Sequence, residues 1–505
     1  MPTHHARYHP DKRVFTFAGT CLSAAELNAA INCLANALLG VGLKKGDKVA
    51  TVMSNRPELV MMYWAAAKTG IIIVPSSTLL QDVGLQELLQ ASDAAMVIAD
   101  VEFDEMLDRI RADLPGIAPD RFVLAGVDCD VPAGFQSYED LVQGASNAEP
   151  PDAHLGDDDI YNIMYSSGTT GTPKGIMHNH YVRANYCSLF ASAFRMTPES
   201  IVLHAGSIVF NGAMIDFMPW MMLGAHYILH SAFDAKRVIA EIQASSVTHI
   251  VMVPSQIMAM LNHPEFDPVK LESLKMIQSL GAPLLLEYKH RLNEALPGRF
   301  YELYGLTEGF ITVLDREDSV KKAGSVGIPL IFHEMKILNE QGEEVPTGEI
   351  GEICGRGPLL MPGYFKQPDL TAKTVVDGWL HSGDAGYVDE DGFLYLVDRL
   401  KDMIISGGVN VFPKDIEELI IGHEAVAEVA VFGVPDDKWG ETPMAAVVLM
   451  NGVTLTPDEL IAWTNEHVSA NFQRISACVV LDDFPRNVAG KTLKREIRER
   501  FLSKI

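Results

Sequence analysis

The chain has 505 residues, which is too long for one compact core and predicts roughly two to four domains. It holds 40 Lys and Arg against 66 Asp and Glu, and the formal net charge of −26 argues against a nucleic-acid partner. The composition is ordinary for a globular protein, and the apolar stretches are too interrupted to predict a transmembrane helix. Scattered cysteines and a polar N-terminus favour reduced thiols and a cytoplasmic location.

Helix and strand patterns alternate through the first half of the chain. A capping-type serine, Ser23, begins a helical pattern that ends near Gly40, and a second helical pattern covers residues 58–69. This alternation predicts a largely parallel sheet with helices on both faces. The apolar runs that predict strands lie at residues 48–53, 70–75, 95–99, 122–125, 160–165, 227–229, 250–253 and 276–280.

The pattern changes in the second half of the chain. Residues 324–396 are rich in glycine and acidic turns with short alternating strands, which suggests a small antiparallel barrel. From residue 416 the order is helix, strand, strand, helix, strand, which suits a separate α+β domain. We therefore predict an α/β fold in three parts. A large N-terminal body of helix-covered sheets with a small antiparallel barrel spans residues 1–398, a hinge spans 399–401, and a smaller mobile α+β lid spans 402–505.

The strongest motif follows the last predicted strand of the first half and runs from Tyr165 to Gly175. Its glycines and small hydroxyl residues leave backbone N–H groups free to surround phosphate oxygens, and Lys174 adds positive charge. Pro173 stands where a Walker A loop needs glycine, which excludes that loop. A flexible linker is the alternative, but a linker needs neither the preceding strand nor the Pro-Lys-Gly ending.

This run resembles the phosphate-binding signature of the adenylate-forming superfamily, which contains acyl-CoA synthetases, adenylation domains of peptide synthetases and firefly-type luciferases. The joint match is closest to the fatty-acid-CoA and coumarate-CoA ligase branch. Such an enzyme converts a carboxylic acid and ATP into acyl-AMP and pyrophosphate, then transfers the acyl group to CoA and releases AMP. Further motifs follow in family order along nearly the whole chain: Gly281-Ala282-Pro283, Tyr304-Gly305-Leu306-Thr307-Glu308, residues 348–364, Ser382-Gly383-Asp384, residues 398–401 and Gly490-Lys491.

The resemblance implies a role for each matching residue. Glu308 would hold Mg²⁺, which favours one or two carboxylates plus phosphate oxygens. Asp384 would accept hydrogen bonds from the ribose hydroxyls, and Lys491 would stabilise charge at the α-phosphate in the transition state. The implied catalytic residues are Lys174, Thr307, Glu308 and Lys491. The implied ATP contacts are Ser166, Ser167, Gly168, Thr169, Thr170, Lys174, Gly281, Ala282, Pro283, Glu302, Leu303, Tyr304, Thr307, Asp384, Arg399 and Lys491.

The resemblance also assigns the C-terminal segment. Lys401 would be the pivot of the small domain, and Gly407 and Gly408 would let the pantetheine chain of CoA approach the backbone. Residues 486–505 hold seven basic and two acidic residues, which fits a solvated helix or a docking surface for a polyanion. The ending Ser503-Lys504-Ile505 lacks the terminal leucine of the Ser-Lys-Leu peroxisomal signal, so we expect a chance match.

The implied acyl pocket departs from the family pattern. Relatives commonly have Phe-His where this chain has Phe210 and Asn211, and the uncharged Asn211 disfavours an α-amino substrate. Glu302 stands where relatives often carry Gln. Core packing is the competing explanation of the Met-rich pocket stretch. His178 and His180 lack further ligands at zinc-like spacing, so we assign them to structure. The predicted pocket residues are Phe210, Asn211, Gly212, Met214, Ile215, Gly309 and Phe310.

We therefore predict an ATP-dependent acyl-CoA ligase for a largely apolar carboxylic acid, with Mg²⁺ as cofactor and ATP and CoA as substrates. The nearest alternative is a stand-alone adenylation enzyme that loads a separate carrier protein. The chain ends 14 residues after Lys491, so we expect no fused carrier. A non-catalytic nucleotide-binding module is the alternative from another class, but it has no need of Lys174, Glu308, Asp384, Arg399 and Lys491 together. The sequence does not identify the acid, and it is compatible with a homo-oligomer.

Overall fold

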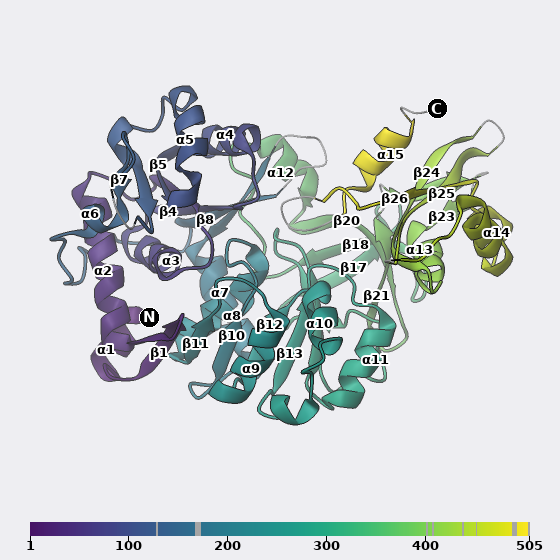
Figure 1. The fold of residues 1–505 in the computed structure, drawn as a ribbon, viewed down its shortest axis with the longest axis horizontal. Helices are drawn as coiled ribbons and strands as arrows, with labels where there is room; N and C mark the ends of the chain where they lie inside the picture. Colours follow the sequence, from purple (N-terminus) through teal and green to yellow (C-terminus); the bar gives the residue numbers. More distant parts are fainter. Residues whose placement is uncertain are drawn as a thin grey trace. The chain divides into compact units, whose positions relative to one another are not determined.

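The computed structural model describes residues 1–127, 130–166, 173–399, 402–406, 409–436, 439–450, 452–486 and 492–502 (Figure 1). The chain forms two compact units. Unit 1 comprises Met1–Met335 and Gly355–Leu380, and unit 2 comprises Lys336–Cys354 and His381–Ile505. Within the described ranges, no helix has the length and apolar character needed to cross a membrane.

Unit 1 contains a seven-stranded sheet in the order β7-β6-β5-β3-β4-β8-β9. Its strands pair in parallel except β9, which is antiparallel to β8. Parallel strands are covered on both faces, which explains why continuous apolar runs predicted them. The strands are β3 (Lys48–Val52), β4 (Ile72–Ser76), β5 (Ala94–Asp100), β6 (Phe122–Ala125), β7 (Gln136–Ser137), β8 (Ile160–Ser166) and β9 (Lys174–Asn179).

The second sheet of unit 1 has nine strands in the order β16-β15-β14-β13-β12-β10-β11-β1-β2. Its central strands are parallel, and β15 and β16 add in antiparallel fashion at one edge. At the other edge β1 pairs in parallel with β11, and Phe15 lies opposite Tyr227. The strands are β1 (Arg13–Phe17), β2 (Thr20–Ser23), β10 (Ile201–His204), β11 (His226–Leu229), β12 (His249–Met252), β13 (Met276–Leu280), β14 (Phe300–Gly305), β15 (Ile311–Leu314) and β16 (Ile328–Pro329).

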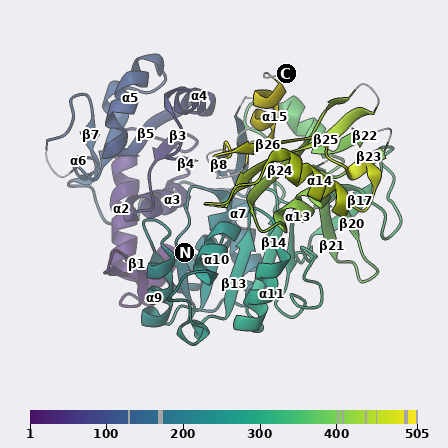
Figure 2. The ribbon, with the colours of Figure 1, turned by 45° about the vertical axis from the view of Figure 1, so that its right-hand side comes forward.

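Helices cover both faces of each sheet. The largest apolar cluster joins the inner faces of both sheets to α2 (Ala24–Gly40), α3 (Pro57–Thr69), α7 (His180–Ala193) and α8 (Met214–Leu223). Figure 2 shows α2 beside α3. Ser23 accepts from the Glu26 N–H while the Glu26 carboxylate accepts from the Ser23 N–H, so the predicted capping serine begins α2. The outer helices are α4 (Asp82–Ser92) and α5 (Asp104–Ile110) on the first sheet, and α9 (Ala235–Ser245), α10 (Pro254–Leu261) and α11 (Leu286–Ala295) on the second.

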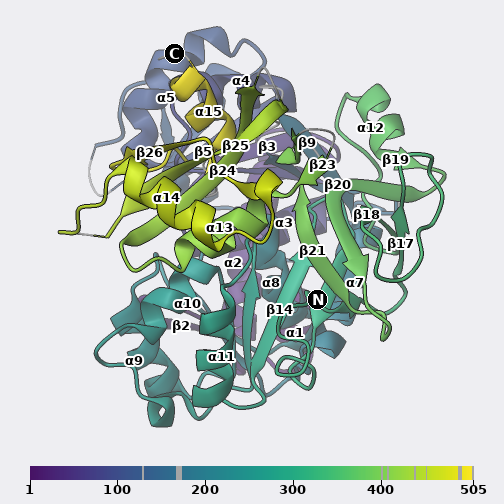
Figure 3. The same cartoon turned by 90° about the vertical axis from the view of Figure 1, so that its right-hand side faces the viewer.

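Unit 2 carries a C-terminal α+β domain. Its sheet has the order β23-β22-β25-β24, and β26 pairs in parallel with β25. Alternate residues of β24 and β25 pack on α13 and α14 on one face and on α15 on the other; Figure 3 shows α13 and α14 in front of these strands. The elements are β22 (Ile404–Ser406), β23 (Val409–Val411), α13 (Pro413–Ile421), β24 (Val426–Asp436), β25 (Gly440–Leu449), α14 (Pro457–His467), β26 (Ala477–Leu481) and α15 (Lys494–Leu502).

A small five-stranded sheet precedes this domain and completes the predicted fold class. It has the order β17-β18-β20-β19, with β21 antiparallel to β20. Compact unit 2 includes Lys336–Cys354 of this sheet, whereas the predicted boundary at residue 398 places the sheet with the N-terminal body. That boundary and the hinge therefore stay predictions. The strands are β17 (Glu334–Leu338), β18 (Gly351–Arg356), β19 (Val375–Val376), β20 (Trp379–Val388) and β21 (Leu394–Arg399).

Candidate active site

One tyrosine connects two of the predicted catalytic residues within unit 1. The segment around Tyr364 runs along β9, because Ile176 forms a bridge with Tyr364 and the Phe365 N–H donates to the Gly175 carbonyl at 2.7 Å. The ammonium of Lys174, at the start of β9, lies 5.9 Å from the centroid of the Tyr364 ring. The chain thus brings a residue from far along the sequence beside the Pro-Lys-Gly ending of the phosphate motif.

The same tyrosine holds Glu308. Its phenol donates to Glu308 Oε1 at 2.8 Å, and the Met361 N–H donates to the Glu308 carbonyl at 2.8 Å. Burial and the neighbouring Glu308 carboxylate raise the pKa of Tyr364, so the phenol remains a neutral donor. The Glu308 side chain is partly exposed, and a carboxylate is the type of ligand that Mg²⁺ prefers.

A buried hydrogen-bond chain lies behind the adjacent residue, Thr307. His178 Nε2 lies 2.9 Å from the Thr307 carbonyl, and the Arg183 guanidinium lies 3.1 Å from His178 Nδ1. Arginine only donates and a carbonyl only accepts, so Nδ1 accepts and Nε2 carries the proton. Burial, reinforced by the Arg183 charge, lowers the pKa of His178 well below its usual value, so the ring is neutral. Asn162 completes the chain by accepting from Arg183 at 2.8 Å.

This geometry predicts different effects for two substitutions of His178. His178→Gln can place an amide donor near the Nε2 position and still reach the Thr307 carbonyl. His178→Asn keeps an acceptor for Arg183 but is too short to reach that carbonyl. We expect His178→Asn to slow acyl-AMP formation about tenfold, which corresponds to the free-energy cost of leaving one buried polar group without its hydrogen bond. His178→Gln should slow it less. The rate of pyrophosphate exchange into ATP, measured in the two folded variants, tests this difference. Equal rates in the two variants would refute a role for His178 in positioning Thr307.

The predicted adenine-side residues lie directly after β13, at a carboxyl end where α/β sheets commonly bind ligands, and within the neighbouring strand β14. Gly281, Ala282 and Pro283 follow β13 and are exposed, while Leu303 on β14 is buried. Glu302 is buried and forms an ion pair with the equally buried Lys289 of α11. Its carboxylate also lies 3.5 Å from the Leu284 N–H, directly after the exposed loop. Glu302 therefore anchors this loop from within the protein, and its contact with ATP stays a prediction.

Lys289 was not recognised from the sequence. Its ammonium donates to the Ala323 carbonyl at 2.9 Å, so the lysine that matches Glu302 is itself fixed in place. A buried charge without its partner is costly. Glu302, which stands where relatives often carry Gln, is therefore matched by the positive charge of Lys289. A lysine in an otherwise polar helix gave no signal of this pairing.

The predicted acyl-pocket residues divide into two groups. Met214 and Ile215 are buried in the apolar cluster between the two sheets, as the core-packing alternative expects, and Phe210 is half-buried beside it. Asn211 donates to the Tyr186 hydroxyl at 3.0 Å, and its Oδ1 is buried without a hydrogen-bond partner among the described residues. A Cβ on Gly212 would lie 2.8 Å from Leu280, so glycine permits a close approach there.

Gly309 and Phe310 pack against the segment that leads to Tyr364. Gly309 has φ +120°, and a Cβ there would lie 2.0 Å from the Leu359 carbonyl oxygen, so only glycine fits. Phe310 is buried and fills the space left open by Gly355. Their role as pocket lining stays a prediction.

In unit 2, Asp384 lies on β20 opposite Arg399 of β21 and is 9% exposed. Tyr304 and Thr307 in unit 1 are partly exposed. Several predicted residues lie outside the described ranges, and for Ser166 and Arg399 only the backbone is described. The predicted residues outside the described ranges are Ser167, Gly168, Thr169, Thr170, Lys401, Gly407, Gly408, Lys491 and the ending 503–505.

Comparisons with known proteins identify the family of the chain. The family described as AMP-binding enzyme matches residues 2–365, and its C-terminal domain family matches residues 415–491. The feruloyl-CoA synthase of an Amycolatopsis species is 35% identical over 99% of this chain and 98% of its own length. The medium/long-chain-fatty-acid–CoA ligase FadD8 of Mycobacterium tuberculosis is 32% identical over 99% of this chain and 90% of its own.

Two further matches bear on the reaction. The fatty acid–[acyl-carrier-protein] ligase ScoC of Streptomyces coeruleorubidus is 30% identical over 98% of this chain and 95% of its own. The solved o-succinylbenzoate CoA synthetase MenE of Bacillus subtilis, in complex with its acyl-adenylate intermediate, superposes with a TM-score of 0.86. It is 29% identical, with 98% of this chain and 97% of that chain covered. The chain therefore belongs to the AMP-binding enzyme family, within the adenylate-forming superfamily predicted from its motifs.

Proposed function

We propose that this chain is an ATP-dependent acyl-CoA ligase that activates a largely apolar carboxylic acid as acyl-AMP and transfers the acyl group to CoA. The observation that carries the proposal is the contact of Tyr364 with both Lys174 and Glu308. The family match and the CoA-ligase names of the relatives confirm the predicted enzyme class, an AMP-forming acid–thiol ligase.

The described residues support separate tasks in the first half-reaction. Two anions, the acid and ATP, must approach each other, and charge develops at the α-phosphate as pyrophosphate leaves. Lys174 supplies positive charge, and Thr307 offers a hydroxyl beside a carbonyl held by His178. Glu308 would hold Mg²⁺, which supplies positive charge against the phosphate oxygens when bound.

The acid and the acceptor are open to direct test. The uncharged Asn211 and its apolar neighbours support an acid without an α-amino group. Incubation with ATP, Mg²⁺, CoA and a panel of aliphatic, branched and aromatic-alkanoic acids should give acyl-CoA and AMP for one class of acid. The similarity to ScoC keeps a carrier protein as the second candidate acceptor. Faster acylation of a pantetheinylated carrier than of CoA would favour it.

We also propose that residues after Lys401 rotate between the two half-reactions. Lys401→Pro fixes one backbone angle and removes a donor, so we expect acyl-AMP formation to survive and thioester formation to slow. Lys401→Ala, which leaves the backbone free, is the matched control. Stopped-flow measurement of each half-reaction decides the matter, and unchanged thioester formation in the proline variant would refute the pivot.

The proposed location is the cytoplasm, which the scattered cysteines support.

A further inference from the structure

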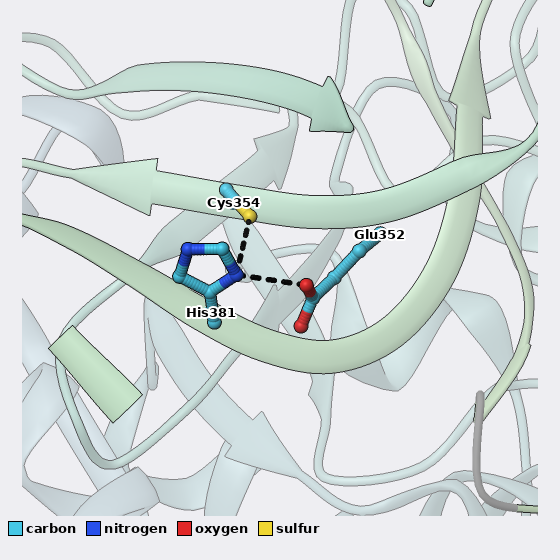
Figure 4. A group of neighbouring side chains, drawn as sticks. All are labelled: Glu352, Cys354 and His381. Atoms are coloured by element: carbon cyan, nitrogen blue, oxygen red, sulfur yellow. Dashed lines mark hydrogen bonds and ion pairs between the residues drawn. The ribbon is translucent and has the colours of Figure 1, made fainter. Parts of the chain in front are cut away.

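Glu352 connects two parts of the strand that leads to Asp384. One carboxylate oxygen, Oε2, lies 2.8 Å from His381 Nδ1, and the other, Oε1, accepts from the Gly383 N–H at 3.0 Å (Figure 4 shows the side chains of Glu352 and His381). Glu352 lies on β18 and both partners lie on the neighbouring strand β20. The carboxylate therefore spans residues 381–383, immediately before Asp384.

The backbone that it holds has an unusual conformation. Gly383 has φ +70°, a left-handed value that favours glycine, and the Asp384 N–H donates to the Ser382 hydroxyl at 3.0 Å. The pairing of β20 with β21 shifts register one residue after Asp384, between Ala385 and Gly386. The direction of the Asp384 side chain thus depends on a local distortion of β20 at Gly383.

We infer that Glu352 is a positioning residue for the ribose end of the ATP site, because its carboxylate fixes the segment of β20 that leads to Asp384. This inference rests on the proposed function, in which Asp384 accepts hydrogen bonds from the ribose hydroxyls. Loss of the carboxylate leaves the half-buried Gly383 N–H and His381 without their acceptor. This segment of β20 then has fewer restraints, and Asp384 meets the ribose less accurately.

Cys354 lies beside the imidazole of His381, and together with Glu352 these side chains form a candidate metal site. Glu352 and Cys354 are two residues apart on β18, so they share one face, and Cys354 Sγ lies 3.4 Å from His381 Nδ1 (Figure 4). The three donor types are those of a zinc site. However, Oε1 of Glu352 already accepts from the Gly383 N–H, a contact that a metal site does not need and that favours positioning over metal binding.

The test compares the binding of ATP and of 2′,3′-dideoxy-ATP, which lacks both ribose hydroxyls. We expect Glu352→Ala to weaken ATP binding about tenfold and to leave dideoxy-ATP binding unchanged. A tenfold loss corresponds to the free energy of one hydrogen bond to a charged group. Glu352→Gln keeps an acceptor for the Gly383 N–H and should recover most of the affinity. Cys354→Ala is the matched control and should bind both nucleotides like the wild type. If Glu352→Ala does not fold, Glu352→Asp, too short to reach both partners, should show a smaller loss confined to ATP.

Asp384→Ala separates the failure of this inference from the failure of the proposed function. If Asp384→Ala does not reduce the preference for ATP over dideoxy-ATP, the ribose role assigned to Asp384 is wrong. If it does and Glu352→Ala does not, the positioning role of Glu352 is wrong. Equal weakening of both nucleotides by Glu352→Ala would show a general structural role and overturn the inference. Stoichiometric zinc in the purified protein, measured by mass spectrometry, would overturn it as well.

Discussion

Replacement of Lys491 by alanine is expected to lower the rate of acyl-AMP formation by on the order of 10²–10³, the usual cost of losing one transition-state charge contact. Lys491 follows Gly490 in a basic tail, and the family resemblance places it between the acid and the α-phosphate. The chain as a whole carries a net charge of −26, whereas residues 486–505 hold seven basic and two acidic residues, so positive charge is concentrated around Lys491 in the sequence.

The two half-reactions should respond differently to this substitution. We expect thioester formation from synthetic acyl-AMP and CoA to survive in Lys491→Ala, because the lysine acts only before pyrophosphate leaves. Arg495→Ala is the matched control, since Arg495 lies on α15 in an exposed pair with Glu499, and such pairs contribute little. Rapid-quench assays of each half-reaction measure the effect. Equal loss in both half-reactions would contradict the assignment.

Replacement of Glu308 by glutamine should lower the rate of acyl-AMP formation by about 10²-fold at fixed Mg²⁺ and raise the Mg²⁺ concentration needed for half-maximal rate. The substitution removes the charge of the proposed metal ligand but keeps an oxygen acceptor for the Tyr364 phenol. ATP binding without metal should change less, because the carboxylate serves the cation rather than the adenosine.

Tyr364→Phe gives the comparison for Glu308. It keeps the Glu308 charge and removes only the hydrogen bond at 2.8 Å, so we expect a smaller loss, about tenfold. Mg²⁺ titrations of the initial rate distinguish the two variants. An unchanged Mg²⁺ dependence in Glu308→Gln would show that this carboxylate does not hold the metal.

The local patterns predicted most elements of the sheets, since buried parallel strands appear as continuous apolar runs. The strand predicted at 122–125 is β6 (Phe122–Ala125), and the helix predicted after Ser23 is α2. Pairings between distant segments could not be read in this way. The N-terminal strand β1 pairs with β11, yet nothing local in residues 13–17 indicates a partner some two hundred residues away.

The motifs likewise identified the family and singled out Lys174, Glu308 and Asp384 as candidates, but they did not indicate which side chains contact these residues or their neighbours. Tyr364 reaches Glu308 because a later segment runs along β9. His178 looked like a structural residue, and only the fold shows that it contacts the Thr307 carbonyl. Glu352 of β18 accepts from the Gly383 N–H on the neighbouring strand β20, a contact that the sequence did not indicate. Each of these contacts depends on tertiary packing, which sequence spacing does not encode.

The most direct test of the proposed function is the exchange of labelled pyrophosphate into ATP, measured without CoA as carboxylic acids are added. We expect exchange that requires both Mg²⁺ and an apolar acid, and that falls to background when the acid is omitted or replaced by an α-amino acid. Absence of acid-dependent exchange across aliphatic, branched and aromatic acids, in protein that binds ATP, would contradict the assignment of this chain as an acyl-AMP-forming ligase.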